Sequence, residues 1–283
     1  MGNIRMPGSV PASGSAKGRR IFMKTVIIHG QSHEGSTCLA ARELAHKVGG
    51  ETQEFFLPRD FDAPCLGCYT CFRTDLTHCP HYGRLKPLAD AILAADLLIF
   101  ASPVYVYHAT GQMMSFLDHF GTWWVVHRPR PEMAHKQAVV IATAAGGGLK
   151  STAKDIADSL EMWGVRKVYR LTFGVQASRP AEVPPRIQER IHAQTGRMAR
   201  RIQSGAEKTG YNRRAKRWFH LIRFAHLHFA RSEPDFSSWE KAGWHGKRRP
   251  WTDRYPPEKH QSPVGAHCTP LHGGFLLFTD NLR

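Results

Sequence analysis

Four cysteines lie close together within residues 64–80 (PCLGCYTCFRTDLTHCP). They are Cys65, Cys68, Cys71 and Cys79, in the pattern C-x2-C-x2-C-x7-C. Thiolates are soft ligands that select zinc, copper or iron–sulfur clusters, and closely spaced cysteines with a proline after the last one are typical of a cluster-binding run. His78 and His81 also permit a mixed cysteine–histidine zinc site. Three interpretations stay open: a cluster, zinc or a redox dithiol, and thiols without a metal.

A second group of chemically useful side chains lies in residues 30–37 (GQSHEGST). Gly30 and Gly35 have the spacing of a nucleoside-triphosphate loop, but Ser36 replaces the required lysine. Hydroxyl groups at the start of a predicted helix are suited to holding a single phosphate. The candidate phosphate ligands are Ser32, His33, Ser36 and Thr37. In the alternative interpretation, Ser36 or Thr37 only caps its own helix.

Two further loops follow predicted strands. Residues 102–107 (SPVYVY) place a proline and aromatic rings after one strand, and residues 143–148 (TAAGGG) place three glycines after another. Glycines permit a close approach of the backbone to a ligand. The candidate residues are Pro103, Val104, Tyr105, Thr143, Gly146, Gly147 and Gly148. The three loops together predict a phosphate pocket, an aromatic wall and a glycine floor, a combination that suits flavin mononucleotide (FMN).

The segments HGQSHEGST, ASPVYVYHATGQMMSFLDHF and HRPRPEMAHKQAVVIATAAGGG resemble the flavodoxin-like NAD(P)H-dependent FMN reductases. The resemblance covers about residues 23–174, with a fainter similarity in residues 235–244 (DFSSWEKAGW). It implies that Ser32, His33, Ser36 and Thr37 hold the FMN phosphate and that the other two loops border the isoalloxazine. It also implies NAD(P)H as co-substrate, with hydride accepted at flavin N5, so no catalytic side chain is expected.

The cysteine run resembles the compact arrangement of the iron–sulfur flavoproteins within this family, which implies a [4Fe–4S] cluster held by the four cysteines. Two departures are the long seven-residue gap and Pro80-His81-Tyr82-Gly83 in place of an acidic pair. A cluster would allow single electrons to enter or leave. The donor would then be NAD(P)H or a ferredoxin-type protein, and the acceptor a small molecule or another protein.

The elements that must position these loops alternate between apolar strands and helical patterns. Strands are predicted over residues 24–30, 53–57, 96–102, 137–143 and 166–174, and helices over 36–48, 85–95, 112–120, 149–163 and 185–204. This alternation predicts an α/β fold, a flavodoxin-like doubly wound five-stranded parallel sheet with a helical C-terminal extension. In such sheets the loops at the carboxyl ends of the strands form the ligand crevice.

The C-terminal extension is predicted to contain one long helix over residues 211–231 and irregular structure after residue 232. In the helix, an apolar stripe has helical spacing and no evident partner in a five-stranded domain, so we expect a homo-oligomer. The stripe consists of Trp218, Leu221, Ile222, Ala225 and Phe229. Cys38, Cys268 and the histidines of the extension are expected to be packing or surface residues.

Charge and composition divide the 283 residues into three parts. Residues 1–22 are predicted to form a flexible basic leader, 23–205 the FMN-binding domain and 206–283 a basic extension. The net charge of +16 is concentrated outside residues 24–185, which are nearly neutral, so the domain is not expected to bind nucleic acid. No apolar run is long enough to span a membrane, and no secretory signal is evident, so a cytoplasmic location is expected. The alternative function is a non-catalytic module that binds an acidic partner through its basic helices.

Overall fold

Five parallel strands form the sheet in the computed structural model of the chain, which describes residues 22–177, 179–229 and 233–252. The strands are β1 (Met23–His29), β2 (Gly50–Phe56), β3 (Leu97–Pro103), β4 (Gln137–Ala144) and β5 (Lys167–Gly174), in the spatial order β2-β1-β3-β4-β5. Chain connections reverse direction between β1 and β3, which creates a crevice at the carboxyl ends of these strands. The predicted fold class is confirmed, and the second strand begins three residues earlier than expected.

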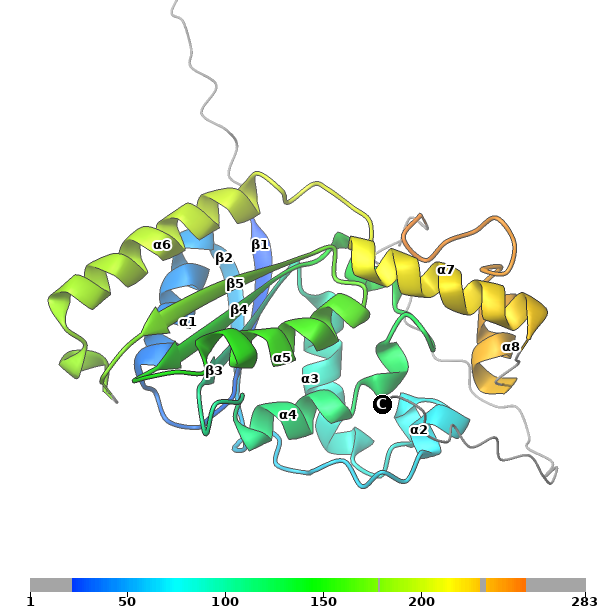
Figure 1. Cartoon of the computed structure of the whole chain (residues 1–283), viewed down its shortest axis with the longest axis horizontal. Helices are drawn as coiled ribbons and strands as arrows, with labels where there is room; N and C mark the ends of the chain where they lie inside the picture. Colours follow the sequence, from blue (N-terminus) through cyan, green and yellow to red (C-terminus); the bar gives the residue numbers. More distant parts are fainter. Residues whose placement is uncertain (1–21, 178, 230–232, 253–283) are drawn as a thin grey trace, which may run out of the picture. The chain divides into compact units, whose positions relative to one another are not determined.

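Successive residues of a strand point to opposite faces of the sheet, and both faces here are covered by helices (Figure 1). In β3, Leu98 and Phe100 contribute to one core, and Ile99 to the other. The first core is covered by α3 (Tyr82–Ala94), α4 (Gly111–Asp118) and α5 (Leu149–Met162), and the second by α1 (Ser36–Val48) and α6 (Pro185–Gln203). This burial on both sides explains why β3 and β4 are almost continuously apolar.

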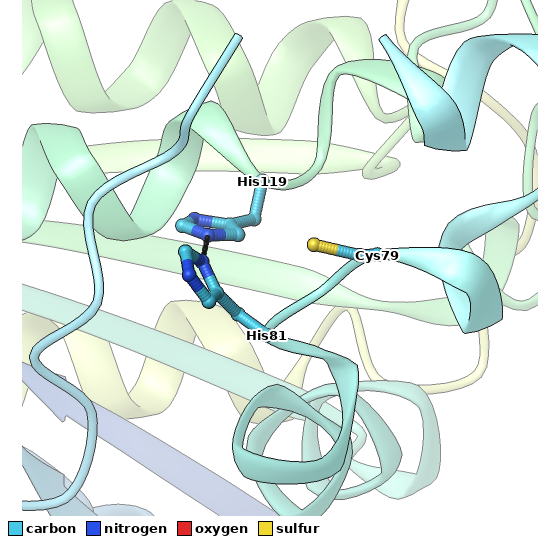
Figure 2. A group of neighbouring side chains, drawn as sticks. All are labelled: Cys79, His81 and His119. Carbon is cyan, nitrogen blue, oxygen red and sulfur yellow. Dashed lines mark hydrogen bonds between the residues drawn. The ribbon is translucent and has the colours of Figure 1, made fainter. Parts of the chain in front are cut away.

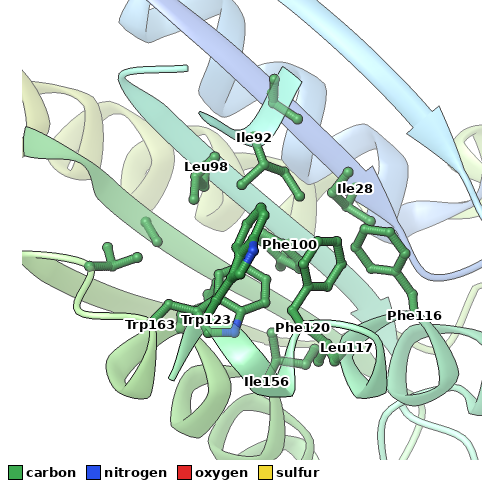
Figure 3. Close-up of a cluster of buried hydrophobic side chains, with 14 of the residues drawn as sticks. Ile28, Ile92, Leu98, Phe100, Phe116, Leu117, Phe120, Trp123, Ile156 and Trp163 are labelled. Atoms are coloured by element: carbon green, nitrogen blue, oxygen red, sulfur yellow. The ribbon is translucent and has the colours of Figure 1, made fainter. Parts of the chain in front are cut away.

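Aromatic side chains fill the core between the sheet and α4 and α5 (Figure 3). The rings of Phe120, Trp123 and Trp163 pack against one another. The Phe120 centroid lies 4.5 Å from Trp123 and 5.1 Å from Trp163, and the two tryptophan centroids are 5.5 Å apart. All three side chains are at least 97% buried. This packing fixes the position of the chain that follows α4, including the short 3-10 helix Gly121–Trp123, which lies beside the cysteine loop.

Two helices of the C-terminal extension differ from the sequence prediction. Helix α7 (Arg213–His228) was expected, but α8 (Glu233–Lys241) was not, so the prediction of irregular structure after residue 232 was wrong for these residues. In the predicted stripe on α7, Trp218, Leu221 and Phe229 are exposed, whereas Phe219, which lies outside the stripe, is fully buried. The Phe219 ring stacks on Trp239 of α8 at 4.5 Å. Helix α8 therefore determines which side of α7 is buried.

Some sequence predictions fall on residues outside the described ranges. The proposed leader, apart from Phe22, and Cys268 belong to this group. Within the described residues, none of the helices has the length and apolar character that crossing a membrane requires.

Candidate functional site

Side chains from three separate loops meet at the carboxyl ends of β1, β3 and β4. The Thr37 and Thr143 hydroxyl oxygens lie 2.5 Å apart and share a hydrogen bond, although 106 positions separate the two residues. The Tyr105 hydroxyl donates to Gln31 Oε1 over 2.7 Å, and the Val104 amide donates to the Thr143 carbonyl over 2.8 Å. The structure therefore brings together the three loops that the sequence singled out.

Gly30 is the point where β1 turns into the first loop. The Thr110 hydroxyl donates to the Gly30 carbonyl over 2.6 Å, and a Cβ at Gly30 would lie only 2.8 Å from that same hydroxyl oxygen. Thr110 also caps α4, because its Oγ1 accepts from the Met113 amide. A side chain larger than hydrogen at position 30 would displace the Thr110 hydroxyl. The sequence analysis did not identify Thr110 as a partner of this turn.

Helix α1 begins at this crevice with the properties of an anion site. Gly35 occupies the N-cap position and no side chain caps the helix. The first turn has no acidic residue, and Ser36 and Thr37 are buried. The alternative interpretation of these hydroxyls as helix caps is therefore wrong. N-terminal amides without an intrahelical partner and the helix dipole favour negative charge, so this end of α1 is suited to a phosphate.

Ser32 and His33 lie farther out on the same loop. The Ser32 hydroxyl donates to the Leu57 carbonyl and accepts from the Arg59 amide, which links the first loop to the chain after β2. His33 is exposed and its Nε2 lies 3.2 Å from Gln31 Nε2. Ser32 therefore joins two loops, and His33 stands at the rim.

The glycine floor is covered by Tyr107, a residue that the sequence analysis did not select. Gly148 has φ of +85°, and a Cβ there would lie 2.7 Å from the Val104 side chain and 2.8 Å from the Tyr107 backbone. A Cβ at Gly147 would meet the Tyr107 ring at 2.7 Å. Gly146 has open space around it. Only glycine at positions 147 and 148 permits this close approach between the loops after β3 and β4.

The four cysteines of residues 64–80 line one cavity of about 170 Å³. Cys65 and Cys68 are exposed, and Cys71 and Cys79 are partly buried. Gly67, between the first two, has φ of +63°, a conformation that lets the chain turn sharply here. Four soft donors around one cavity fit a cysteine-ligated cluster, whereas Cys38 is buried elsewhere.

Arg128 holds the cysteine loop through hydrogen bonds to the short helix α2 (Thr70–Arg73) and the residue after it. The Arg128 guanidinium donates to the carbonyl oxygens of Cys71, Phe72 and Thr74. These carbonyls lie at the C-terminal end of α2, where a cation interacts favourably with the unpaired groups. Asp235 of α8 forms an ion pair with Arg128, so the extension is linked to the cysteine loop through this arginine.

The pKa values of the thiols differ within the loop. A hydrogen bond with the Thr70 side chain lowers the pKa of Cys68. Burial raises the pKa of Cys71, and the neighbouring thiolates raise it further. Burial raises the pKa of Cys38 to about 11.

The thiolate form of a cysteine is the nucleophile in alkylation. In metal-free chain at neutral pH, we therefore expect iodoacetamide to modify Cys68 before Cys71 and to spare Cys38, as followed by peptide mass spectrometry. Modification of Cys71 first would contradict this electrostatic order.

Two histidines lie beside Cys79 (Figure 2). His81 Nδ1 is 3.3 Å from His119 Nε2, and one ligand atom from each of the three residues lies within 4.8 Å of the other two. His119 is 2% exposed, and burial lowers its pKa. The sequence analysis considered His81 but missed His119, because 38 positions separate them and only the end of α4 brings His119 here.

The sheet order and the crevice at its switch point define a flavodoxin-like α/β protein. Residues 23–176 match the family NADPH-dependent FMN reductase. The chain belongs to this family, and is an enzyme of the FMN reductase type, as the resemblance of its motifs predicted.

The chain is also similar to two iron–sulfur flavoproteins. The protein of Methanosarcina thermophila is 29% identical over 151 residues, which are 50% of this chain and 75% of that protein. The protein of Archaeoglobus fulgidus is 30% identical over 112 residues, which are 39% of this chain and 49% of that protein.

Among solved structures, the chain is similar to the apo form of an NADH:FMN oxidoreductase (EMOB), with a TM-score of 0.46 and 22% identity over 67% of this chain and 95% of the other. It is also similar to an NAD(P)H:quinone oxidoreductase of Methanothermobacter marburgensis, with a TM-score of 0.45 and 16% identity over 68% of this chain and 100% of the other.

Proposed function

We propose that the chain is an FMN-dependent NAD(P)H oxidoreductase that also exchanges single electrons through a [4Fe–4S] cluster. Bound FMN supplies redox chemistry in either one- or two-electron steps, and the cluster supplies a one-electron carrier. The observation that carries the flavin assignment is the meeting of three loops at the β1–β3 switch point, joined by the Thr37–Thr143 hydrogen bond. Family membership supports it independently.

The residues proposed for FMN divide by chemistry. The phosphate would be held at the start of α1 by the hydroxyls of Ser36 and Thr37 and by backbone amides, with Ser32 and His33 nearer the rim. The flat ring system would lie against the loops after β3 and β4. Those loops contribute Pro103, Val104, Tyr105, Thr143, Gly146, Gly147 and Gly148. Gly147 and Gly148 let Tyr107 and its neighbours pack closely against the loop after β4.

The cluster would be held by Cys65, Cys68, Cys71 and Cys79, which line one cavity. Helix α4 supports the proposal that the two centres work together. The helix is capped at its start by Thr110, which binds the turn at Gly30, and ends next to His119 at the cysteine cavity. The eight residues of α4 span about 12 Å, so one rigid element sets the separation between the two centres.

Anaerobic purification tests this proposal directly. We expect a yellow protein that releases FMN and contains about four irons and four sulfides per chain. Cys71→Ser should lose most of the iron and retain FMN, because the flavin loops do not depend on that thiol. Cys38→Ser is the matched control, since Cys38 is buried away from the cavity, and it should keep both. Less than one iron per wild-type chain would rule out the cluster.

The donor and acceptor follow from the same proposal. NADPH or NADH would deliver a hydride, and a ferredoxin-type protein would be the one-electron donor or acceptor. Anaerobic reduction of the bound flavin by each donor, followed by absorbance, separates them. Reduction by ferredoxin alone would favour a ferredoxin-fed flavoprotein without NAD(P)H use. Five described cysteines are free thiols, which fits the reducing cytoplasmic location that we propose.

We also retain the proposal of a homo-oligomer, with Trp218 and Leu221 of the predicted stripe and with Phe224 beside them. Helix α7 presents Trp218, Leu221 and Phe224 to solvent, each more than 40% exposed. Sedimentation of the full chain at micromolar concentration should show a species larger than the monomer, and Phe224→Glu should shift it toward the monomer. Sedimentation as a monomer before and after the change would exclude this interface.

A further inference from the structure

Cys79, His81 and His119 form a compact group of metal-ligand side chains with a geometry of its own. His81 Nδ1 and His119 Nε2 lie 3.3 Å apart. Figure 2 shows the Cys79 thiol on the same side as the two facing rings. The three residues come from the segment after the 3-10 helix Leu76–His78 and from the end of α4. Two loops that are distant in sequence thus converge on one point.

The separation of the two ring nitrogens matches that of two imidazoles on one tetrahedral zinc ion. With zinc–nitrogen bonds of about 2.05 Å at the tetrahedral angle, the nitrogens lie about 3.3 Å apart. A thiolate at about 2.3 Å from the same ion lies about 3.6 Å from each nitrogen. The three ligand atoms lie within 4.8 Å of one another, which is close to the separations that a shared ion requires.

A second contact orients His119 as a metal ligand. The His119 Nδ1–H group donates to the Ser115 carbonyl over 2.9 Å, which leaves the lone pair on Nε2. Metal-binding histidines characteristically donate their other ring N–H to a carbonyl in this way, because the contact fixes the tautomer and the ring orientation. The Phe61 ring meets the His119 ring edge-on at 5.0 Å and further restricts it.

The hydrogen bond between the rings then has a defined direction. Because His119 Nε2 carries the lone pair, the Nδ1–H of His81 is the donor. A divalent ion between the rings would take the place of that proton. His81 would carry its proton on Nε2 instead, and the Cys79 thiol would release its proton to solvent.

We propose that Cys79, His81 and His119 form a mononuclear site for a zinc-class divalent cation, used when Cys79 does not ligate a cluster. The donor set of two imidazoles and one thiolate is the borderline-soft combination that zinc accepts, and water completes the fourth position. Cys79 belongs to both ligand sets, so each chain holds either the ion or the cluster. The site does not depend on the flavin, and it rests on the proposed function only in sharing Cys79.

Co²⁺ titration of the full chain, freed of metal with chelator under anaerobic conditions, tests the site. Tetrahedral Co²⁺ with a thiolate ligand shows d–d bands and a charge-transfer band that are absent for the free ion. We expect wild type and Cys65→Ser to bind one Co²⁺ per chain with similar affinity, and Zn²⁺ to displace it. His119→Gln and His81→Gln should each weaken Co²⁺ binding at least 100-fold.

Cluster reconstitution of the same variants provides the opposite readout. Cys65→Ser should fail to assemble a cluster, whereas both histidine variants should assemble it, which also shows that they fold. His81 is more exposed than His119. If His119→Gln proves unstable, His81→Gln therefore provides the deciding measurement. Co²⁺ binding that is lost in Cys65→Ser and unchanged in the histidine variants would overturn the site. Absence of a cluster in every chain, with Co²⁺ binding as expected, would instead contradict the proposed function alone.

Discussion

Replacing Asp235 with alanine should destabilise the protein by about 3–5 kcal/mol, the usual cost of removing one partner from a buried ion pair. The Asp235 side chain is only 7% exposed. Its Oδ2 lies 2.8 Å from His127 Nδ1, and its Oδ1 lies 3.1 Å from Arg128 Nε. The second contact is ionic, because its angles are not those of a hydrogen bond. Without this carboxylate, Arg128 loses its ion pair with α8 and its mostly buried guanidinium has no anion from that helix.

Urea denaturation of the full chain measures this loss. Glu233→Gln is the matched control, because Glu233 also lies in the first turn of α8 but is exposed; we expect a change below about 1 kcal/mol there. The alkylation rate of Cys71 in the native chain should also rise in Asp235→Ala, since Arg128 holds the Cys71 carbonyl. Equal stability of the Asp235 variant and wild type would show that the extension does not brace the loop.

The sheet was predictable because its strands are short, strongly apolar and separated by helical patterns. Leu97–Pro103 and Gln137–Ala144 are nearly all buried, since both of their faces are covered. The start of β2 was missed because its first residues, including Glu51 and Thr52, are exposed at the edge of the sheet and give no apolar signal. An edge strand therefore gives a weaker apolar pattern in the sequence than a central strand does.

The C-terminal helices were less predictable because tertiary contacts decide them. Helix α7 has apolar residues on several sides, so spacing alone did not select the buried one. Phe219 is buried because Trp239 and Trp244 of the following segment pack against it. Helix α8 is short and contains Pro234 in its first turn, and its apolar anchor is one residue, Trp239. Patterns this short are indistinguishable from loops in a sequence.

The crevice was found from the sequence because its residues follow three strands directly. Thr37 and Thr143 were both selected, and the structure joins them. Thr110 and His119 were missed because they lie at the two ends of α4, where a cap and a last-turn histidine have ordinary structural roles. The Asp235–Arg128 contact was missed because more than a hundred residues separate its partners. Local spacing reveals ligands on one loop, but it cannot reveal partners that the fold brings together.

Replacing Ser36 with aspartate should weaken the binding of FMN far more than the binding of a flavin without a phosphate. Ser36 is the first residue of α1, a helix with no acid in its first turn. A carboxylate there interacts favourably with the helix dipole, by about 0.3–1 kcal/mol, but Ser36 is only 7% exposed and burying an unpaired carboxylate costs more than this gain. The metal-free, flavin-free chain should therefore unfold at a lower urea concentration than wild type. The same carboxylate would face the phosphate that we propose for this helix end. Two like charges about 4 Å apart cost about 4 kcal/mol near a protein surface.

We therefore expect the dissociation constant for FMN to rise at least 100-fold in Ser36→Asp, as measured by flavin fluorescence quenching on titration of the apoprotein. Riboflavin, which lacks the phosphate, is the matched ligand control, and its affinity should change by less than tenfold. Ser36→Asn is the neutral control variant and should retain most FMN affinity, because an amide still donates hydrogen bonds to phosphate. An equal loss for FMN and riboflavin would place the phosphate elsewhere and assign Ser36 to the shape of the crevice.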